Sequence, residues 1–324
     1  MIDTRGLIHA IALDGLGGGK LLTWDDIQQP LKTDELLWIH LDYEQPDAID
    51  WLQNHSGLQP IEIDSLLAEA SRPRCVSHRE KLLLNLRGVN TNPGADPEDM
   101  VSIRLVCQNN RIISTRRRRL LSVQDIANSL KQGHGPKNIG ELCSALTRRL
   151  IERMRSVINE LDEDIDELEA SIINSSQQKL RGQLINRRRE IIQLRRFLSP
   201  QREALAKLQH EEVSWLNSSD RLALRESADQ LARYLEDLDS CRDRAAVIQE
   251  ELASLLAEAM NKRMYLLSIV TAVFLPLGFL TGLFGINVGG IPLAENPSGF
   301  IIISSMIVFL VLLQVVILRL TRWF

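Results

Sequence analysis

Two long runs without a charged side chain lie near the end of the chain. No charge occurs between Met264 and Ala294, and a helix over Met264–Phe284 would span about 30 Å, the thickness of a bilayer core. A second uncharged run, Phe300–Leu318, is long enough to cross back. The segment between them is rich in glycine and holds Pro292, which interrupts a helix. The pattern predicts a membrane hairpin; the alternative is a hairpin buried in a soluble protein.

Basic residues beside these runs predict their orientation. Lys262 and Arg263 precede the first run, Arg319 and Arg322 follow the second, and residues 285–299 contain neither Lys nor Arg. Positively charged flanks stay on the cytoplasmic side of a membrane. We therefore expect both chain termini, and the large N-terminal part, in the cytoplasm.

Residues 1–140 hold nearly all the strand signals, as short apolar runs bounded by turn residues. Helical stretches lie between these runs, which predicts a mixed α/β domain. Gly15–Lys20 lacks the spacing of a phosphate-binding loop, so we expect a plain hairpin turn there. The expected strands are Leu7–Leu13, Leu36–Leu41, Leu82–Val89, Met100–Val106 and Arg111–Thr115, and the expected helices are Asp47–Asn54, Pro60–Glu69 and Ser122–Lys131.

Helix-breaking residues become scarce after residue 140, which favours long helices. The first is expected from about Gly140 to Ile173 and carries the acidic stretch Glu160–Glu169. The polar turn Asn174–Gln178 leads to a second helix with the basic run Arg187–Arg189. If the two helices lie antiparallel, acidic and basic side chains screen each other; the alternative is that the acidic end also attracts cations.

A third helix is expected to begin at Ser218 or Ser219, either of which can cap it. No breaker separates it from the first uncharged run, so Ser219–Phe284 is predicted to be one helix of about 66 residues, roughly 100 Å long. So long a helix needs partners along its length, and parallel self-association is the expected source. Its apolar positions repeat every three or four residues, as in a heptad seam: Leu224, Ala228, Leu231, Leu235, Leu238, Cys241, Ala245, Ile248, Leu252, Leu255 and Ala259.

The same spacing, carried into the first membrane run, gives one face that is smaller and more polar than the opposite face. Small and hydroxyl residues in a membrane gather where helices meet or where water enters. The face therefore predicts either the wall of a pore, with Met264 and Leu275 as apolar constrictions, or tight packing of small residues. Its members are Asn261, Met264, Ser268, Thr271, Leu275, Gly278 and Gly282.

Charge and cysteine content exclude other classes. The net charge is −4, and the basic run Arg116–Arg119 is best explained as solvated surface, so we expect no nucleic-acid partner. The four widely spaced cysteines indicate reduced thiols rather than disulfides or a zinc site. No nucleophile–base pair or ligand cluster suggests an enzyme. The membrane runs offer no imidazole or thiolate, so a cation on this path should keep part of its water.

The string Phe279-Leu-Thr-Gly-Leu-Phe-Gly-Ile-Asn-Val-Gly-Gly-Ile-Pro292 resembles the CorA family of divalent-metal transporters, and specifically its ZntB zinc-transport branch. The usual family motif is Gly-Met-Asn, and Ile286 stands here in place of the methionine. The resemblance covers essentially the whole chain. Further similar segments are Trp38–Leu41, Arg72–Arg74, Arg195–Arg202 and Arg322–Phe324.

The resemblance implies a funnel-shaped homopentamer in the inner (plasma) membrane, with an α+β cytoplasmic domain, a long helical stalk and two C-terminal membrane helices. It implies that Gly285, Ile286 and Asn287 ring the outer mouth, that Asn287 contacts a hydrated ion, and that Leu267 joins the pore-lining positions. Glu295 is the only acidic residue of the loop and a possible further metal contact. The implied segments are 1–140 (α/β domain), 141–218 (helical hairpin), 219–263 (stalk), 264–284 (first span), 285–299 (external loop), 300–318 (second span) and 319–324 (tail).

The leading functional prediction is a pentameric transporter of divalent cations, with Zn²⁺ as cargo and no resident cofactor. One alternative is a Mg²⁺/Co²⁺ channel of the same architecture. Another is a membrane-anchored scaffold or sensor whose helices dimerise.

Overall fold

The computed structural model describes residues 5–29, 35–69, 72–172, 177–286 and 296–320. The chain forms two compact units, Met1–Gln249 and Glu250–Phe324. The boundary between them falls inside one long helix, within the segment predicted as the stalk.

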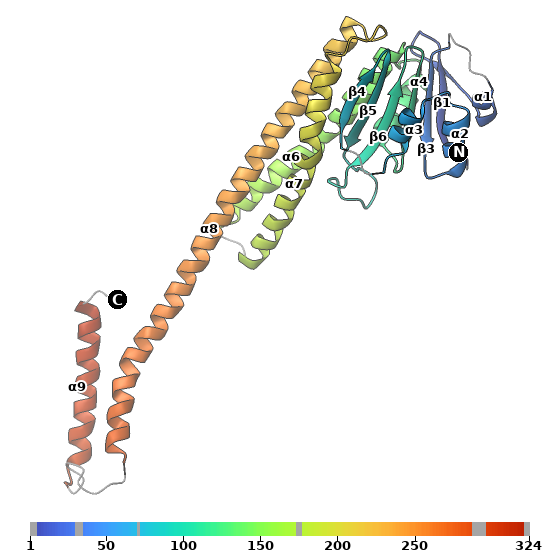
Figure 1. The fold of residues 1–324 in the computed structure, drawn as a ribbon. Coiled ribbons are helices and arrows are strands. Elements are labelled where there is room, and N and C mark those ends of the chain that lie inside the picture. Colours follow the sequence, from blue (N-terminus) through green and yellow to red (C-terminus); the bar gives the residue numbers. More distant parts are fainter. Residues whose placement is uncertain (1–4, 30–34, 70–71, 173–176, 287–295, 321–324) are drawn as a thin grey trace. The chain divides into compact units, whose positions relative to one another are not determined.

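The first unit is built on a mixed seven-stranded sheet with the order β2-β1-β3-β7-β6-β5-β4 (Figure 1). The pair β3 and β7 is parallel, in the register Leu37↔Arg111, and every other neighbouring pair is antiparallel. The strands are β1 (Leu7–Leu13), β2 (Gly19–Leu21), β3 (Leu37–Asp42), β4 (Arg74–His78), β5 (Lys81–Gly88), β6 (Val101–Cys107) and β7 (Arg111–Arg116).

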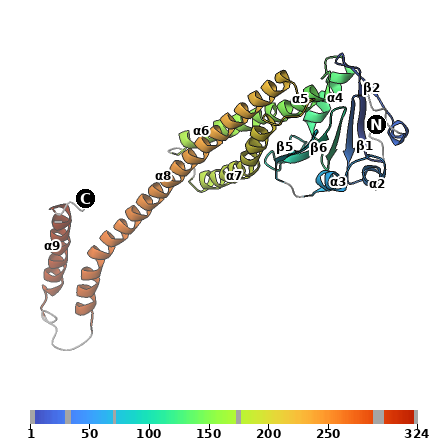
Figure 2. The same cartoon turned by 45° about the horizontal axis from the view of Figure 1, so that its top comes forward.

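Helices cover both faces of this sheet, and the central strands are therefore buried on both sides. The short helices α1 (Trp24–Gln28), α2 (Pro46–Asn54) and α3 (Pro60–Leu67) bury Trp24, Trp51 and Leu66 against one face. On the other face lie α4 (Leu121–Lys131), α5 (Ile139–Glu152) and part of α7 (Gln177–Leu208), as Figure 2 shows.

All five predicted strands and the three predicted short helices are confirmed. The glycine-rich segment is a hairpin turn between β1 and β2, as expected: Asp14 accepts hydrogen bonds from the backbone N–H groups of Leu16 and Gly18, while Gly15 and Gly17 have positive φ. The prediction missed β2, β4 and α1, which are three to five residues long. Such short elements carry too few positions for a period to be recognised.

The predicted helix from Gly140 to Ile173 is wrong in one respect, because it is two helices. It is interrupted at Arg153, between α5 and α6 (Met154–Ala170). At this break Arg153 forms an ion pair of 2.7 Å with Asp125 of α4. The predicted turn Asn174–Gln178 lies mostly outside the described residues.

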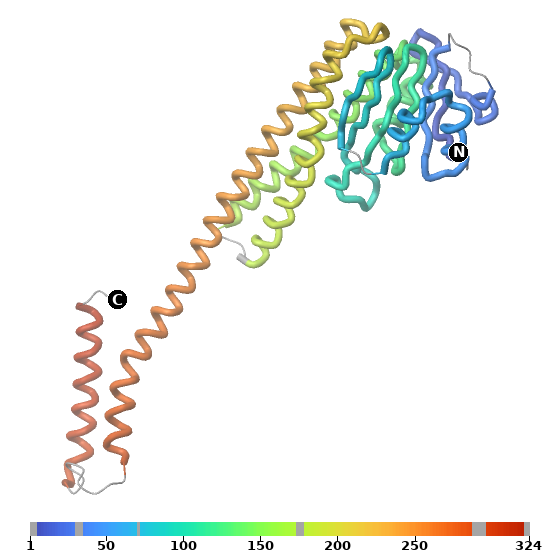
Figure 3. Tube along the Cα trace, in the orientation of Figure 1, coloured from blue at the N-terminus to red at the C-terminus, as the bar shows by residue number. Residues whose placement is uncertain are grey.

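The long third helix is confirmed as α8 (Ser218–Phe284), 67 residues. The second uncharged run forms α9 (Gly299–Leu320), 22 residues. Within the first unit, α6 and α7 run alongside the N-terminal half of α8 (Figure 3).

This neighbourhood corrects the explanation of the heptad seam. The seam residues from Leu224 to Ile248 are already buried within the single chain. Arg244 of α8 pairs with Asp162 and Asp166 of α6, and Arg195 of α7 lies 2.8 Å from Asp239 of α8. The inference that this part of the seam needs a second copy of the chain is therefore wrong, since α6 and α7 supply the partners.

Candidate functional site

The second unit contains the C-terminal part of α8 and the whole of α9. Both helices hold a stretch long and apolar enough to cross a membrane, and neither stretch is buried in the structure. A soluble protein does not leave this much apolar surface in water.

Within this unit, two faces of α8 differ in the exposure of their side chains. At about 100° per residue, the half-buried positions gather on one side of the helix, and the predicted pore positions gather on the opposite side. The half-buried positions are Ile269, Val273, Pro276, Leu277, Leu280 and Phe284, and the exposed pore positions are Asn261, Met264, Leu267, Ser268, Thr271, Leu275 and Gly278.

The exposed face combines large apolar side chains with hydroxyl groups. Leu275 is 67% exposed. Ser268 donates its hydroxyl hydrogen to the Met264 carbonyl at 2.9 Å, and Thr271 donates to the Leu267 carbonyl at 2.8 Å. With their hydrogens bound to the helix, both hydroxyl groups turn oxygen lone pairs outward. Oxygen lone pairs can accept hydrogen bonds from the water shell of a cation, and they repel anions.

The predicted selectivity loop is only partly described. Gly285 donates its N–H to the Thr281 carbonyl at 3.0 Å and ends the helix, and Ile286 after it is exposed. Asn287 and Glu295 lie outside the described residues, so their roles remain predictions. On the far side of the loop, Asn296 accepts a hydrogen bond of 2.9 Å from the Ser298 N–H as α9 begins.

Sequence reasoning missed Gln314, the one carboxamide in α9. Its Oε1 atom is buried and has no hydrogen-bond partner among the described residues. An amide oxygen that lacks a partner inside a membrane span is satisfied most readily by a hydrogen bond from another helix. The signal was present, because a glutamine is unusual in an uncharged run whose only other polar side chains are those of Ser304 and Ser305.

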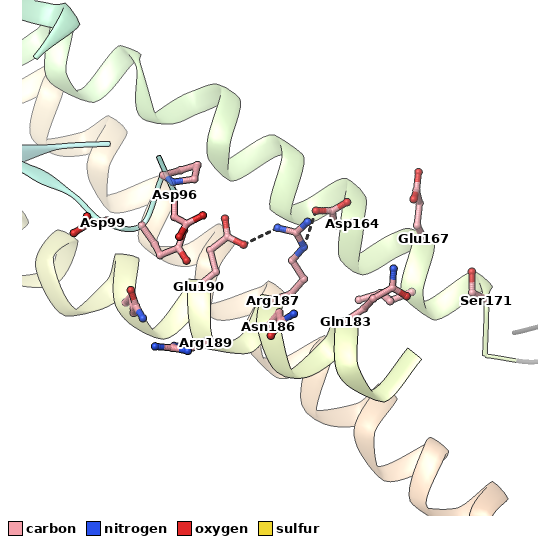
Figure 4. Close-up of a pocket in the computed structure, with 14 residues that line it drawn as sticks. Asp96, Asp99, Asp164, Glu167, Ser171, Gln183, Asn186, Arg187, Arg189 and Glu190 are labelled. Carbon is pink, nitrogen blue, oxygen red and sulfur yellow. Dashed lines mark hydrogen bonds and ion pairs between the residues drawn. The ribbon is translucent and has the colours of Figure 1, made fainter. Parts of the chain in front are cut away.

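A polar groove of about 610 Å³ lies between α6, α7 and the loop from Asp96 to Asp99 (Figure 4). Arg187 occupies its middle and reaches Asp164 at 2.9 Å and Glu190 at 2.7 Å. Burial raises the pKa of Glu190, while the Arg187 guanidinium opposes that rise. The groove is therefore a place where acidic and basic side chains neutralise each other.

This arrangement confirms that the acidic helix lies beside basic side chains. The acids of α6 pair with arginines of both α7 and α8. Among the described residues no group of three or more His, Cys, Asp or Glu side chains is placed to hold a metal ion. The geometry thus favours mutual screening over cation attraction.

All four cysteines are free and buried, as expected for reduced thiols. The fold brings three of them together, which their sequence spacing did not indicate. Burial raises the pKa of Cys75 to about 12, and a hydrogen bond with Cys143, together with burial, raises the pKa of Cys107 well above its usual value. Thiols held protonated in this way are poor nucleophiles and poor metal ligands.

An α/β unit joined through one continuous helix to two C-terminal spans defines the class: a membrane protein with two transmembrane helices at its C-terminal end. The profile of the CorA-like Mg²⁺ transporter protein family matches residues 33–320. The chain belongs to this family of transporters, which confirms the prediction that it is not an enzyme.

Individual relatives match over nearly the full length. A zinc transport protein ZntB of Yersinia enterocolitica is 37% identical over 99% of this chain and 97% of its own. The divalent cation transporter CmaX of Pseudomonas aeruginosa is 40% identical over 99% and 98%. The solved structure of full-length CmaX superposes with a TM-score of 0.85, covering 99% of both chains. The CorA magnesium transporter of Methanocaldococcus jannaschii, 19% identical, shares the fold with a TM-score of 0.83 over 98% of this chain and 99% of its own.

Proposed function

We propose that this protein moves divalent cations, with Zn²⁺ as the main cargo, through a pore lined by α8 in a homopentamer. Support for the cargo comes from similarity to relatives named as a zinc transport protein and a divalent cation transporter. Mg²⁺ or Co²⁺ as the main cargo is the second candidate, because the family is described by Mg²⁺ transport.

The observation that carries the proposal is the separation of the two faces of α8. The face with half-buried residues such as Val273 and Leu280 is the one that α9 can cover. The face with Ser268, Thr271 and Leu275 is exposed and has no cover from the described residues. A ring of copies would bring these uncovered faces together around a central path.

The chemistry of that face suits an ion that keeps its water. No charged side chain, imidazole or thiolate occurs between Met264 and Ala294. A bare Zn²⁺ ion would find none of its preferred ligands there. A hydrated divalent ion can instead pass Ser268 and Thr271, whose oxygens accept hydrogen bonds from its first-shell water.

Subunit contacts should begin where the chain stops covering α8. Leu256, Met260 and Met264 are exposed large apolar residues that follow the buried seam. Replacing Met260 with glutamate should give smaller species in detergent, measured by light scattering. A pentamer mass that survives this change would place the subunit contacts elsewhere.

The orientation and the outer loop complete the proposal. Lys262, Arg263 and Arg319 keep the first unit on the cytoplasmic side. Asn287 then faces the outer mouth, where its amide can hold a hydrated ion, with Glu295 nearby in sequence.

The deciding experiment is flux into proteoliposomes that contain the purified full-length protein, with Zn²⁺ and Mg²⁺ compared at equal gradients and empty liposomes as the control. Zn²⁺ flux that exceeds Mg²⁺ flux supports the proposal, and the reverse supports the Mg²⁺ alternative. Absence of any flux would favour the scaffold or sensor.

Two substitutions of Asn287 test the outer loop. Asn287→Ala should lower the flux with the oligomer mass unchanged, and Asn287→Asp should bind the cation more tightly and release it more slowly. If Asn287→Ala transports at the wild-type rate, the selectivity site lies deeper, at Thr271 or Asn261.

A further inference from the structure

A second cavity, separate from the ion path, lies in the first unit beside the β1–β2 edge of the sheet. Its volume is about 850 Å³, within the size range of sites that hold small organic molecules. Strand β1, strand β7 and helix α4 contribute to its wall through His9, Arg116 and Lys131.

The charged groups of the wall are strongly unbalanced. Among the described lining residues, four are cationic (Arg5, Arg116, Arg119 and Lys131) and one is a carboxylate, Asp25, which lies 3.5 Å from Arg5. Arg119 is held by Gln124, whose Oε1 accepts from Arg119 Nε at 3.1 Å. The cavity therefore carries an excess of positive charge that its own carboxylate does not balance.

Arg116 is the unusual member of this set. It is only 7% exposed, yet its guanidinium forms no hydrogen bond or ion pair among the described residues, and its Nε atom is buried without a partner. Burial lowers the pKa of Arg116 and the Arg119 charge adds to this, while Asp42, its register partner on β3, opposes it without forming an ion pair. A buried cation without a partner is costly unless an anion is present to satisfy it. This also corrects the prediction that Arg116–Arg119 is simple solvated surface, because Arg116 is the buried end of β7.

His9 shows that the positive potential acts inside the cavity. Burial and the charges of Lys131 and Arg116 lower its pKa to about 4, so it is neutral at physiological pH. In the sheet register, His9 lies opposite His40, and His40 lies opposite Ser114. His40 Nδ1 shares a hydrogen bond of 2.8 Å with the Ser114 hydroxyl, which ties this row of side chains together.

Apart from Thr23 and Gln124, the rest of the wall is apolar. Leu120 and Val123 come from the α4 side and Leu7 and Leu21 from the strands. A site that joins an arginine-rich end to an apolar wall suits an anion that carries an organic body. Arginine matches the geometry of phosphate oxygens with paired N–H groups.

We propose that this cavity binds a small organic phosphate, with Arg116 as the main anion contact and Arg119 and Lys131 in support. The site is independent of the ion path and of the transport proposal.

Isothermal titration calorimetry on the detergent-purified full-length protein tests the site, with adenosine 5′-monophosphate as the soluble probe and adenosine as its uncharged control. The monophosphate should bind and adenosine should not. Short-chain phosphatidic acid serves as a lipid probe, and its binding compared with that of the monophosphate distinguishes a membrane source of the phosphate from a soluble source.

Arg116→Gln should weaken binding of the phosphate probe by about tenfold or more, as expected for loss of a charge-assisted contact. The matched control is Arg117→Gln, since Arg117 is exposed, pairs with Glu44 at 2.6 Å and does not line the cavity. This control should bind like the wild type. Lys131→Gln, at an exposed position, should give a smaller loss of affinity. This variant tests the site even if Arg116→Gln fails to fold.

A second measurement separates a binding role from a structural role. Because the Arg116 guanidinium has no hydrogen-bond or ion-pair partner in the part of the chain that the structure describes, Arg116→Gln should not lower the melting temperature of the ligand-free protein. The site would be disproved by failure of both phosphate probes to bind, by adenosine binding as tightly as its monophosphate, or by unchanged affinity in Arg116→Gln.

Discussion

The two units treat apolar surface in opposite ways, although α8 passes through both. In the first unit Leu238 is fully buried by the chain's own helices, whereas Leu275 in the second unit is 67% exposed. Both leucines belong to the same kind of repeat on the same helix. A periodic apolar pattern therefore identifies a face of a helix but not what covers that face.

Polar groups follow the same division. The first unit pairs its charges across helices, as Arg244 does with Asp162 and Asp166. The membrane run after Met264 holds no charged group to pair. We therefore expect stability and its pH dependence to be properties of the first unit, and flux to be a property of the second.

The largest expected effect concerns the buried part of the seam. Leu238→Ala leaves a cavity and should lower the free energy of unfolding by about 2–5 kcal/mol. Leu222→Ala is the control on the same helix, because Leu222 is 60% exposed, and it should cost less than about 0.5 kcal/mol. Thermal unfolding followed by circular dichroism measures both. Equal melting temperatures would mean that the chain does not bury the seam by itself.

The next effect concerns the uncovered face. Leu275→Ser should raise cation leak by about tenfold, equivalent to ~1.4 kcal/mol in the barrier, since a polar ring no longer excludes water. Leu277→Ser is the matched control, because Leu277 is half-buried on the opposite face. Flux into proteoliposomes compares the two. If Leu277→Ser leaks as much as Leu275→Ser, the pore face has been assigned wrongly.

A third prediction separates the units by pH. The folded-state pKa of His9 is about 4, against an ordinary value of 6.5. Between these pH values His9 binds a proton in the unfolded chain but stays neutral in the folded chain. Stability that is present above pH 6.5 is therefore lost as the pH falls towards 4, and His40, whose pKa is also lowered by burial, acts in the same direction.

Melting temperatures measured across this window test the third prediction. His9→Gln should flatten the curve, whereas His55→Gln, at an exposed position, should leave it unchanged. A curve that keeps its full slope in His9→Gln would show that other groups cause the acid sensitivity.

The smallest expected effect is electrostatic. Arg244→Gln removes two ion pairs with partly exposed carboxylates, so it should lower the free energy of unfolding by only about 0.5–1 kcal/mol, and less at high salt. The control Arg242→Gln removes pairs with Asp239 and Asp243 on the same helix and should cost still less. A large loss in Arg244→Gln that salt does not reduce would indicate packing rather than charge.

Local patterns in the sequence determined much of this protein. The uncharged runs around Met264–Phe284 and Phe300–Leu318 were sufficient to predict two spans, because bilayer thickness sets helix length. Alternation and turn residues were sufficient for strands such as Leu7–Leu13. The continuity of α8 followed from the scarcity of breaking residues. Each of these depends on neighbours within a few positions along the chain.

The contacts that those elements make became visible only in the folded chain. It showed that Leu231 and Leu238 pack inside the chain, that Cys107 meets Cys143, and that Arg116 is buried beside a cavity. The partners in these contacts come from distant segments, and a one-dimensional pattern holds no information about which segment covers a given face. Burial and pairing belong to the folded arrangement, since they depend on distances that the sequence spacing does not determine.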